Sequence, residues 1–248
     1  MIIGSIKEDL SIEKRVSLTP ETTKNIINLG LKIYIEKNYA THIGIDDKEY
    51  EQYGAEIKNS TSDILNTSNL LIKVNCPTEN EISQLKEKTI LIGMLNPSKN
   101  KKEINEIIKK NIKIFSLELL PRITRAQSMD VLSPQSNLAG YRSVVDSIFE
   151  FEKAIPMMMT AAGTVPAAKV LVIGAGVAGL QAIATAKRLG AIVSATDVRA
   201  ASKEQVESLG GKFLTVEGAE NLETEGGYAK EASNDFKKKQ EELLSDTL

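Results

Sequence analysis

The chain has 248 residues, a formal net charge of −2 and a single cysteine, Cys76. This length is enough to bury a sizeable core in one or two domains. The near-neutral charge, without a basic patch interleaved with aromatic residues, argues against a nucleic-acid partner, and one cysteine excludes an internal disulfide and fits a reducing compartment. The chain opens directly on a strand-like run, and its most apolar stretch, 170–186, is interrupted by three glycines, so neither a secretory signal nor a membrane span is expected.

The first half of the chain alternates apolar runs with helix-forming runs. Thr19 and Pro20 form a helix start, as N-cap and first helical residue, and Gly30 ends that helix. Strands are expected at 1–6, 32–35, 70–74, 90–93 and 112–115, with further helices at 47–53 and 101–110. This alternation predicts parallel βαβ units with helices on both faces of a sheet.

A connection between two domains is expected at 120–134, where the sequence has neither a strand period nor a helix period. A long helix is expected at 135–151. The methionines at 157–159 are expected to fill gaps in a core, as this flexible residue often does. We therefore predict an α/β protein with two Rossmann-like or flavodoxin-like βαβ domains and parallel sheets, at 1–133 and 134–248.

The second domain contains a glycine-rich turn in the context that dinucleotide binding requires. An apolar strand at 169–173 runs into Gly174-x-Gly176-x-x-Gly179, a helix-forming run follows, and a second apolar strand ends in Asp197. The first glycine permits the tight turn, the second lets a pyrophosphate approach the main chain, and the third lets the helix lie close on the strand. The alternative is a glycine-rich turn in some other α/β protein, but strand, turn, helix and acid in this order favour a dinucleotide site.

Asp197 also bears on the choice of cofactor. A carboxylate at this position can bind the ribose hydroxyls of the adenosine, and it would repel a 2′-phosphate. NAD(H) is therefore favoured over NADP(H). Arg199 weakens that argument, because a cation two residues away can accommodate a 2′-phosphate.

Several segments resemble one protein family. They are written PRITRAQSMD, QSNLAGY, PMMMTAAGTVP, DVRAASKEQVESLG and GGYAK, at 121–130, 135–141, 156–166, 197–210 and 226–230. Together they resemble the NAD(H)-binding component of proton-translocating nicotinamide nucleotide transhydrogenases. The likeness covers the whole chain, and the alanine dehydrogenases share this fold.

The resemblance implies roles for individual residues. The nicotinamide end of the nucleotide would be held by Arg122, Gln127, Asp130 and Ser133. The rest of it would be bound by Gly174, Ala175, Gly176, Val177, Gly179, Asp197, Val198 and Arg199, with Tyr228 on a loop that closes over the nucleotide. From the residues alone, Arg122 is equally a solvated loop cation, Asp130 a turn former and the segment around Tyr228 a surface loop.

The implied function is hydride transfer from NADH to NADP⁺, coupled to proton translocation across a membrane. NADP(H) would be carried by a partner component, and a further partner would span the membrane. The resemblance also implies a homodimer, in the cytoplasm at the inner face of a bacterial plasma membrane.

Two other functions stay open at this point. An alanine dehydrogenase needs cations for the substrate carboxylate and an acid/base at the reacting carbon. Arg15 and Lys73 resemble its carboxylate-binding pair, but Asn96 occupies the position of its catalytic histidine, and the chain's only histidine, His42, lies elsewhere. Hydride transfer between two nicotinamides needs no such base, so the missing histidine favours transhydrogenase. The third possibility is a non-catalytic NAD-binding module.

The second domain is expected to be incomplete. A doubly wound dinucleotide fold usually has six strands, whereas apolar runs predict three, at 169–173, 192–196 and 212–216. A charged helix is expected after them, from Tyr228 to 244. The strand at 169–173 would then have an unpaired, apolar edge, so we expect the chain to bind NADH poorly and to associate.

Overall fold

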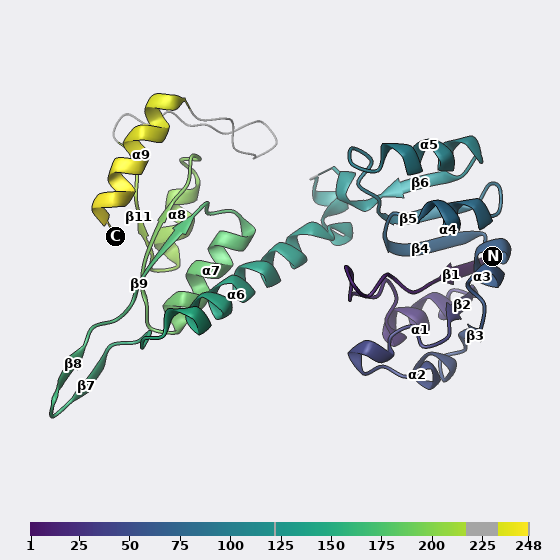
Figure 1. Ribbon diagram of the computed structural model, residues 1–248, viewed down its shortest axis with the longest axis horizontal. Helices are drawn as coiled ribbons and strands as arrows, with labels where there is room; N and C mark the ends of the chain where they lie inside the picture. Colours follow the sequence, from purple (N-terminus) through teal and green to yellow (C-terminus); the bar gives the residue numbers. More distant parts are fainter. Residues whose placement is uncertain (122, 217–232, 248) are drawn as a thin grey trace. The chain divides into compact units, whose positions relative to one another are not determined.

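The structure is a computed structural model, and it describes residues 1–121, 123–216 and 233–247. The chain forms two compact units, Met1–Asp130 and Val131–Leu248, which are treated separately below (Figure 1). The expected fold class is confirmed, because both units are α/β with parallel sheets. Among the described helices, none is long and apolar enough to cross a membrane.

Unit 1 contains a six-stranded sheet with the order β3-β2-β1-β4-β5-β6, and all neighbouring strands are parallel. The strands are β1 (Ile2–Ser5), β2 (Lys32–Glu36), β3 (Glu56–Lys58), β4 (Leu70–Asn75), β5 (Ile90–Met94) and β6 (Lys113–Ser116). The helices are α1 (Pro20–Asn28), α2 (Asp47–Glu51), α3 (Thr61–Thr67), α4 (Glu79–Gln84) and α5 (Lys101–Lys109), with short 3₁₀ turns at η1 (Thr41–Ile43), η2 (Leu117–Leu119) and η3 (Thr124–Met129).

Helices cover both faces of this sheet, as the alternation predicted. Successive residues of β4 point to opposite faces, so Leu70 packs in the core beneath α1 and α2, and Leu71 in the core beneath α3, α4 and α5. The start of α1 is as expected. Thr19 caps it, accepting a hydrogen bond from the Thr22 amide, and Pro20 is its first residue.

Unit 2 contains a three-stranded parallel sheet with the order β11-β10-β9. Its elements are α6 (Leu132–Phe151), β7 (Met158–Thr160), β8 (Gly163–Val165), β9 (Lys169–Ile173), α7 (Val177–Arg188), β10 (Ile192–Thr196), α8 (Ser202–Ser208), β11 (Lys212–Phe213) and α9 (Asn234–Thr247). The core lies between the sheet and α7, where Ile183 and Val193 are buried, and α6 packs against α7. Among the described residues, β9 has a neighbour on one side alone.

The expectation that the three methionines fill a core is wrong. They lie in the antiparallel hairpin of β7 and β8, which projects from unit 2 (Figure 1). Met157, Met158 and Met159 are 59%, 49% and 74% exposed. A ribbon of two short strands buries little of its own surface, so unbranched apolar side chains on it stay in contact with water.

Candidate functional site

The glycine-rich turn joins β9 to α7 at the carboxyl end of the sheet. Gly174 has a φ of +91°, which side chains rarely allow, and its amide donates to the carbonyl of Thr196 on β10 at 2.8 Å. Gly179 lies in the first turn of α7, where an added Cβ would overlap the Gly174 carbonyl oxygen. The positive φ and this close approach set the helix N-terminus directly above the end of β9, as the motif predicted.

Asp197 follows β10 and closes against this turn. Its Oδ2 accepts from the Ala175 amide at 2.7 Å, and its Oδ1 accepts from the Arg199 amide at 2.8 Å. The Arg199 guanidinium adds two more bonds, from Nε at 2.9 Å and from Nη2 at 2.8 Å. Burial by itself raises the pKa of the Asp197 carboxyl, but these hydrogen bonds outweigh burial and hold that pKa below its ordinary value.

Two long helices fix the start of α7 in place. Gly140 is buried in the middle of α6, and an added Cβ there would overlap the main chain of Ala178 in the first turn of α7. The two helices therefore touch through their backbones beside the glycine turn. Sequence reasoning missed this role, although the signal, a glycine inside an apolar helix, was present in QSNLAGY.

Helix α9 also reaches the carboxyl end of the sheet. Gln240 Nε2 donates to the Thr196 hydroxyl at 3.2 Å, one residue before Asp197. This polar side chain was missed as well. A glutamine within a charged helix carries no signal of its position in the fold.

The other expected site residues are placed as follows. Val177 is the first residue of α7, and Val198 lies half-buried in the loop after β10. Gln127 is exposed in η3, and its carbonyl accepts from the amide of Asp130, which ends that turn in unit 1. Ser133 is half-buried in the first turn of α6, in unit 2. Arg122 and Tyr228 lie outside the described residues.

The structure thus brings one set of the expected residues together, around the glycine turn of unit 2. Gln127 and Asp130 belong to unit 1, so they are described within that unit. The turn is open to a ligand on its outer side. An added Cβ on Gly174 would meet no atom within 4 Å, and one on Gly176 would meet only Arg199 Nη2, at 3.9 Å.

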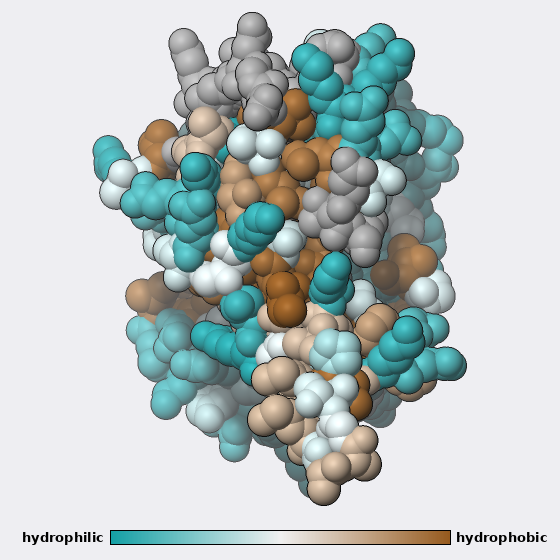
Figure 2. Space-filling model, turned by 90° about the vertical axis from the view of Figure 1, so that its left-hand side faces the viewer, coloured by the Kyte–Doolittle hydropathy of each residue, from teal (hydrophilic) through white to brown (hydrophobic). Residues whose placement is uncertain are grey.

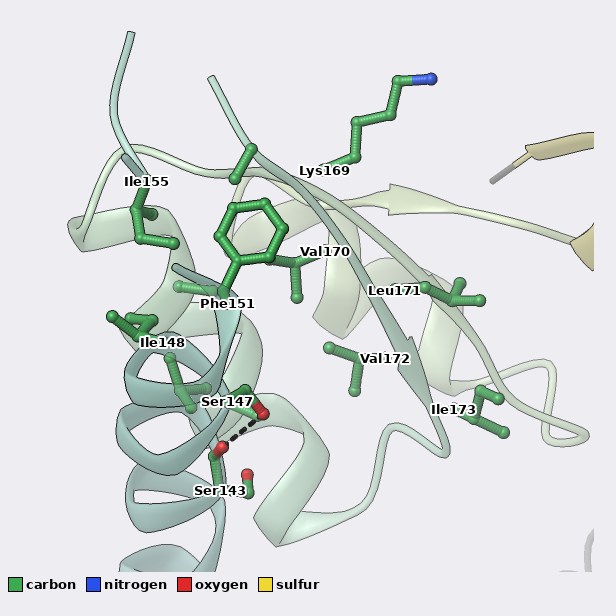
Figure 3. A pocket seen from close by; sticks show the side chains of 14 residues that line it. Ser143, Ser147, Ile148, Phe151, Ile155, Lys169, Val170, Leu171, Val172 and Ile173 are labelled. Carbon is green, nitrogen blue, oxygen red and sulfur yellow. Dashed lines mark hydrogen bonds between the residues drawn. The ribbon is translucent and has the colours of Figure 1, made fainter. Parts of the chain in front are cut away.

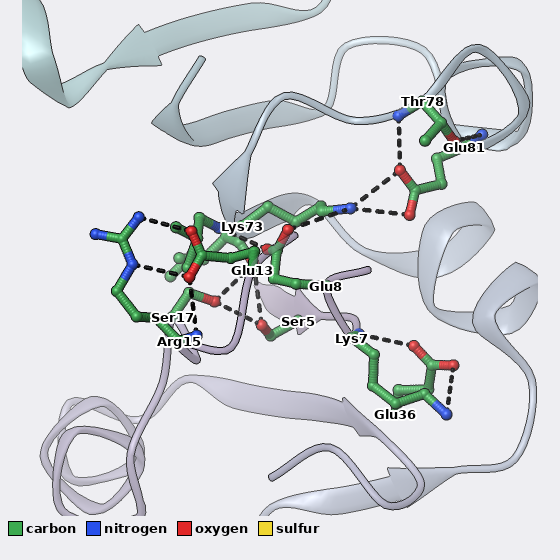
Figure 4. A network of polar contacts seen from close by, with 12 residues as sticks. Ser5, Lys7, Glu8, Glu13, Arg15, Ser17, Glu36, Lys73, Thr78 and Glu81 are labelled. Atoms are coloured by element: carbon green, nitrogen blue, oxygen red, sulfur yellow. Dashed lines mark hydrogen bonds and ion pairs between the residues drawn. The ribbon is translucent and has the colours of Figure 1, made fainter. Parts of the chain in front are cut away.

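Unit 1 carries a second polar cluster at the carboxyl ends of β1 and β4 (Figure 4). This is the point where the strand order reverses, and ligands of open α/β sheets often bind there. The Lys73 ammonium is buried and lies 2.9 Å from a carboxylate oxygen of Glu81 and 3.8 Å from one of Glu8. Arg15 donates to both carboxylate oxygens of Glu13, at 2.9 and 2.6 Å. Both cations are therefore paired with carboxylates of the chain itself.

The position that resembles a dehydrogenase histidine is held by Asn96, directly after β5. Asn96 has a φ of +47°, and its amide donates to Glu118 Oε1 at 2.5 Å. Its side-chain oxygen accepts from the Ser98 hydroxyl at 3.3 Å. An amide side chain exchanges no proton near neutral pH, so this position offers no general acid or base.

An apolar groove of about 370 Å³ lies between α6 and β9 (Figure 3). Ile148 and Phe151 of α6 line one side, and Val170 and Val172 of β9 line the other. Ile173, at the end of β9, is 70% exposed. In the space-filling view that faces the hairpin of unit 2, apolar side chains gather on the surface (Figure 2). This groove runs along the side of β9 that has no neighbouring strand among the described residues.

Comparison with known proteins gives a match to one family along nearly the whole chain. Residues 4–139 match the family described as alanine dehydrogenase/PNT, N-terminal domain, and residues 143–248 match its C-terminal domain. The chain is 49% identical over 251 aligned residues to the first of the polypeptides that make up the NAD(P) transhydrogenase alpha subunit of Rhodospirillum rubrum, which covers 98% of this chain and 65% of that protein. It is 46% identical to the protein of the same description from Rickettsia prowazekii, covering 99% of this chain and 65% of that one.

More distant relatives and solved structures agree. An alanine dehydrogenase of Methanococcus maripaludis is 30% identical, over 87% of this chain and 58% of that protein. The crystal structure of a transhydrogenase from Sinorhizobium meliloti matches with a TM-score of 0.82 and 49% identity, over 87% of this chain and 64% of that one. An L-alanine dehydrogenase structure matches in fold, with a TM-score of 0.75. The chain spans about two thirds of the length of the transhydrogenase relatives.

Proposed function

Because this chain belongs to the alanine dehydrogenase/PNT family, we propose that it binds NAD(H) and serves as the NAD(H)-binding part of a transhydrogenase. The observation that carries this proposal is the joint geometry of the glycine turn and Asp197. The turn presents the N-terminus of α7 beside an open space, and the carboxylate lies at the end of the neighbouring strand. An anionic pyrophosphate and a ribose diol match these two features.

The turn and Asp197 bind and orient the nucleotide, which supplies the hydride. The pyrophosphate would lie against Gly174, Ala175, Gly176, Val177 and Gly179, and the adenosine ribose against Asp197, Val198 and Arg199. Arg122, Gln127, Asp130 and Ser133 would hold the nicotinamide end, with Tyr228 closing over it. Hydride passes from NADH to NADP⁺ without a proton at the reacting carbon. The protein's task at that end is therefore to hold the ring in place and exclude water.

Amino-acid dehydrogenation is a weaker candidate for this chain. The two cations that would take a substrate carboxylate, Arg15 and Lys73, are each paired with a glutamate. Asn96 supplies no proton to a carbonyl oxygen or an amine. Both observations favour transfer between nicotinamides.

The proposed partners follow from the same assignment. NADP(H) would be bound by a separate component, and a membrane-spanning component would couple the reaction to proton movement at the inner face of the plasma membrane. We also propose a homodimer. The hairpin of β7 and β8 supports it, since its exposed methionines form a flexible apolar surface of the kind that a second copy can cover.

A mixing assay tests the proposal. The chain is combined with an NADP(H)-binding component, NADH and a spectroscopically distinct NADP⁺ analogue, and reduction of the analogue is followed. Turnover that needs both proteins is the expected result. Turnover with pyruvate, ammonium and NADH in place of the second component would instead show an alanine dehydrogenase. NADH binding without turnover in either mixture would show a non-catalytic module.

A further inference from the structure

The Asp197 carboxylate already has a full set of hydrogen-bond donors from this chain. A carboxylate offers about four acceptor positions. Oδ1 accepts from N and Nε of Arg199, at 2.8 and 2.9 Å, and Oδ2 accepts from the Ala175 amide at 2.7 Å and from Arg199 Nη2 at 2.8 Å. A ribose hydroxyl that donates to Asp197 must therefore replace one of these four donors.

Two of the four donors are fixed, and two can be exchanged. The amides of Ala175 and Arg199 belong to the main chain of the turn and the loop. The guanidinium ends a long side chain that is 21% exposed, whereas the Asp197 side chain is 6% exposed. A ribose diol offers two hydroxyl donors, the same number that the guanidinium supplies.

We propose that Arg199 is an intramolecular competitor of NAD(H), whose guanidinium occupies the ribose-binding positions of Asp197 and leaves them when the nucleotide binds. This inference rests on the proposed function, since it takes the ribose of NAD(H) as the incoming ligand. It gives Arg199 a role opposite to that of an ordinary contact residue. Its two guanidinium bonds must be broken for binding, so they lower the affinity for NADH.

The competition also bears on the choice between NADH and NADPH. A free Asp197 carboxylate repels a 2′-phosphate, but a guanidinium held within its reach offsets part of that repulsion. Removing the guanidinium leaves the carboxylate open to the ribose hydroxyls of NADH and fully repulsive to NADPH. The preference for NADH is then expected to widen.

The test compares the parent chain with Arg199→Ala, titrating each with NADH and with NADPH by nucleotide fluorescence. We expect the Kd for NADH to fall in the variant, by up to about tenfold, and the Kd for NADPH not to fall. Arg188→Ala is the matched control, because it removes the same charge from an exposed position in the last turn of α7. It is expected to leave both Kd values unchanged.

A pH titration separates competition from a general change in the loop. Without the guanidinium the pKa of Asp197 rises toward its ordinary value of about 4, so NADH binding by Arg199→Ala weakens below about pH 5, while binding by the parent stays flat there. In the parent, the Nε–H resonance of Arg199 is also expected to shift when NADH is added to saturation. This signal needs no variant, so it keeps the proposal testable even where Arg199→Ala fails to fold.

An NADH Kd that stays the same or rises in folded Arg199→Ala overturns the proposal, as does an Arg199 resonance unmoved by saturating NADH. Asp197→Asn tells this failure from that of the proposed function. Unchanged NADH binding in Asp197→Asn refutes the nucleotide site itself. Weakened binding in both Asp197→Asn and Arg199→Ala keeps the site and refutes the competition, because Arg199 would then be a ligand contact.

Discussion

The substitution Gly179→Ala tests how the turn between β9 and α7 is built. A Cβ at this position would overlap the carbonyl oxygen of Gly174, a main-chain atom that no rotamer change can move away. Overpacking of this kind costs about 1–3 kcal/mol, and the better helix propensity of alanine offsets up to about 1 kcal/mol. Because the clash is with main chain, we expect the upper end of the range and a net loss of about 2 kcal/mol in the free energy of unfolding.

Gly176→Ala is the matched comparison, three residues away in the same turn. Its Cβ would meet only Arg199 Nη2, at 3.9 Å, and its φ of −76° suits any residue. Alanine is a poorer N-cap than glycine, but it loses less chain entropy on folding, so we expect the stability to change by less than about 0.5 kcal/mol. The added methyl group fills the space proposed for the pyrophosphate. NADH binding is therefore expected to weaken although the fold is intact.

Urea unfolding followed by circular dichroism gives the two free energies, and nucleotide fluorescence gives the two Kd values. Gly179→Ala should lose stability and NADH binding together, and Gly176→Ala should lose binding alone. Equal free energies of unfolding in the two variants would refute the close approach of α7 to the turn. Parent-like NADH binding by Gly176→Ala would refute the position of the pyrophosphate.

The remaining predictions concern the nicotinamide end, the open sheet edge and the buried carboxylate of unit 1. If Arg122 and Asp130 position the nicotinamide, Arg122→Ala and Asp130→Asn should slow hydride transfer in the mixing assay by about a hundredfold and weaken NADH binding less, and normal transfer rates would reject that role. Ile173→Lys places a charge at the open edge of β9, so light scattering should show less association than in the parent, whereas Ile12→Lys, at an exposed position of unit 1, should not change it; equal effects would argue against the edge as the contact. Burial raises the pKa of Glu8, against the charge of Lys73, so the folded state favours the protonated carboxyl; its stabilising contribution is complete below the unfolded pKa and is lost as pH rises through the folded value. Glu8→Gln, which cannot ionise, should lose less stability than the parent between about pH 4 and pH 8 in thermal unfolding, and identical pH profiles would contradict this.

The parts of the fold that sequence predicted depend on local signals. Apolar runs of four to six residues gave the five longest strands of unit 1, and Thr19 with Pro20 gave the start of α1. Short and polar elements were missed. β3 (Glu56–Lys58) has three residues, and α4 depends on a capping box in which Glu81 accepts from the Thr78 amide. The family resemblance, carried by five longer segments, is confirmed by the matches along the chain.

The contacts that sequence could not predict join residues far apart in the chain. Gly140 meets Ala178 because two helices cross there, and Gln240 reaches Thr196 across 44 positions of sequence. Asp197 shows the same limit at short range. The motif correctly gave its position beside the turn, but not that Arg199 takes two of its acceptor positions. A motif fixes which groups meet a ligand, whereas the donors already bound to those groups decide how much of their affinity the ligand obtains. The strength of this site is therefore set by an internal hydrogen-bond competition that lies outside the glycine pattern.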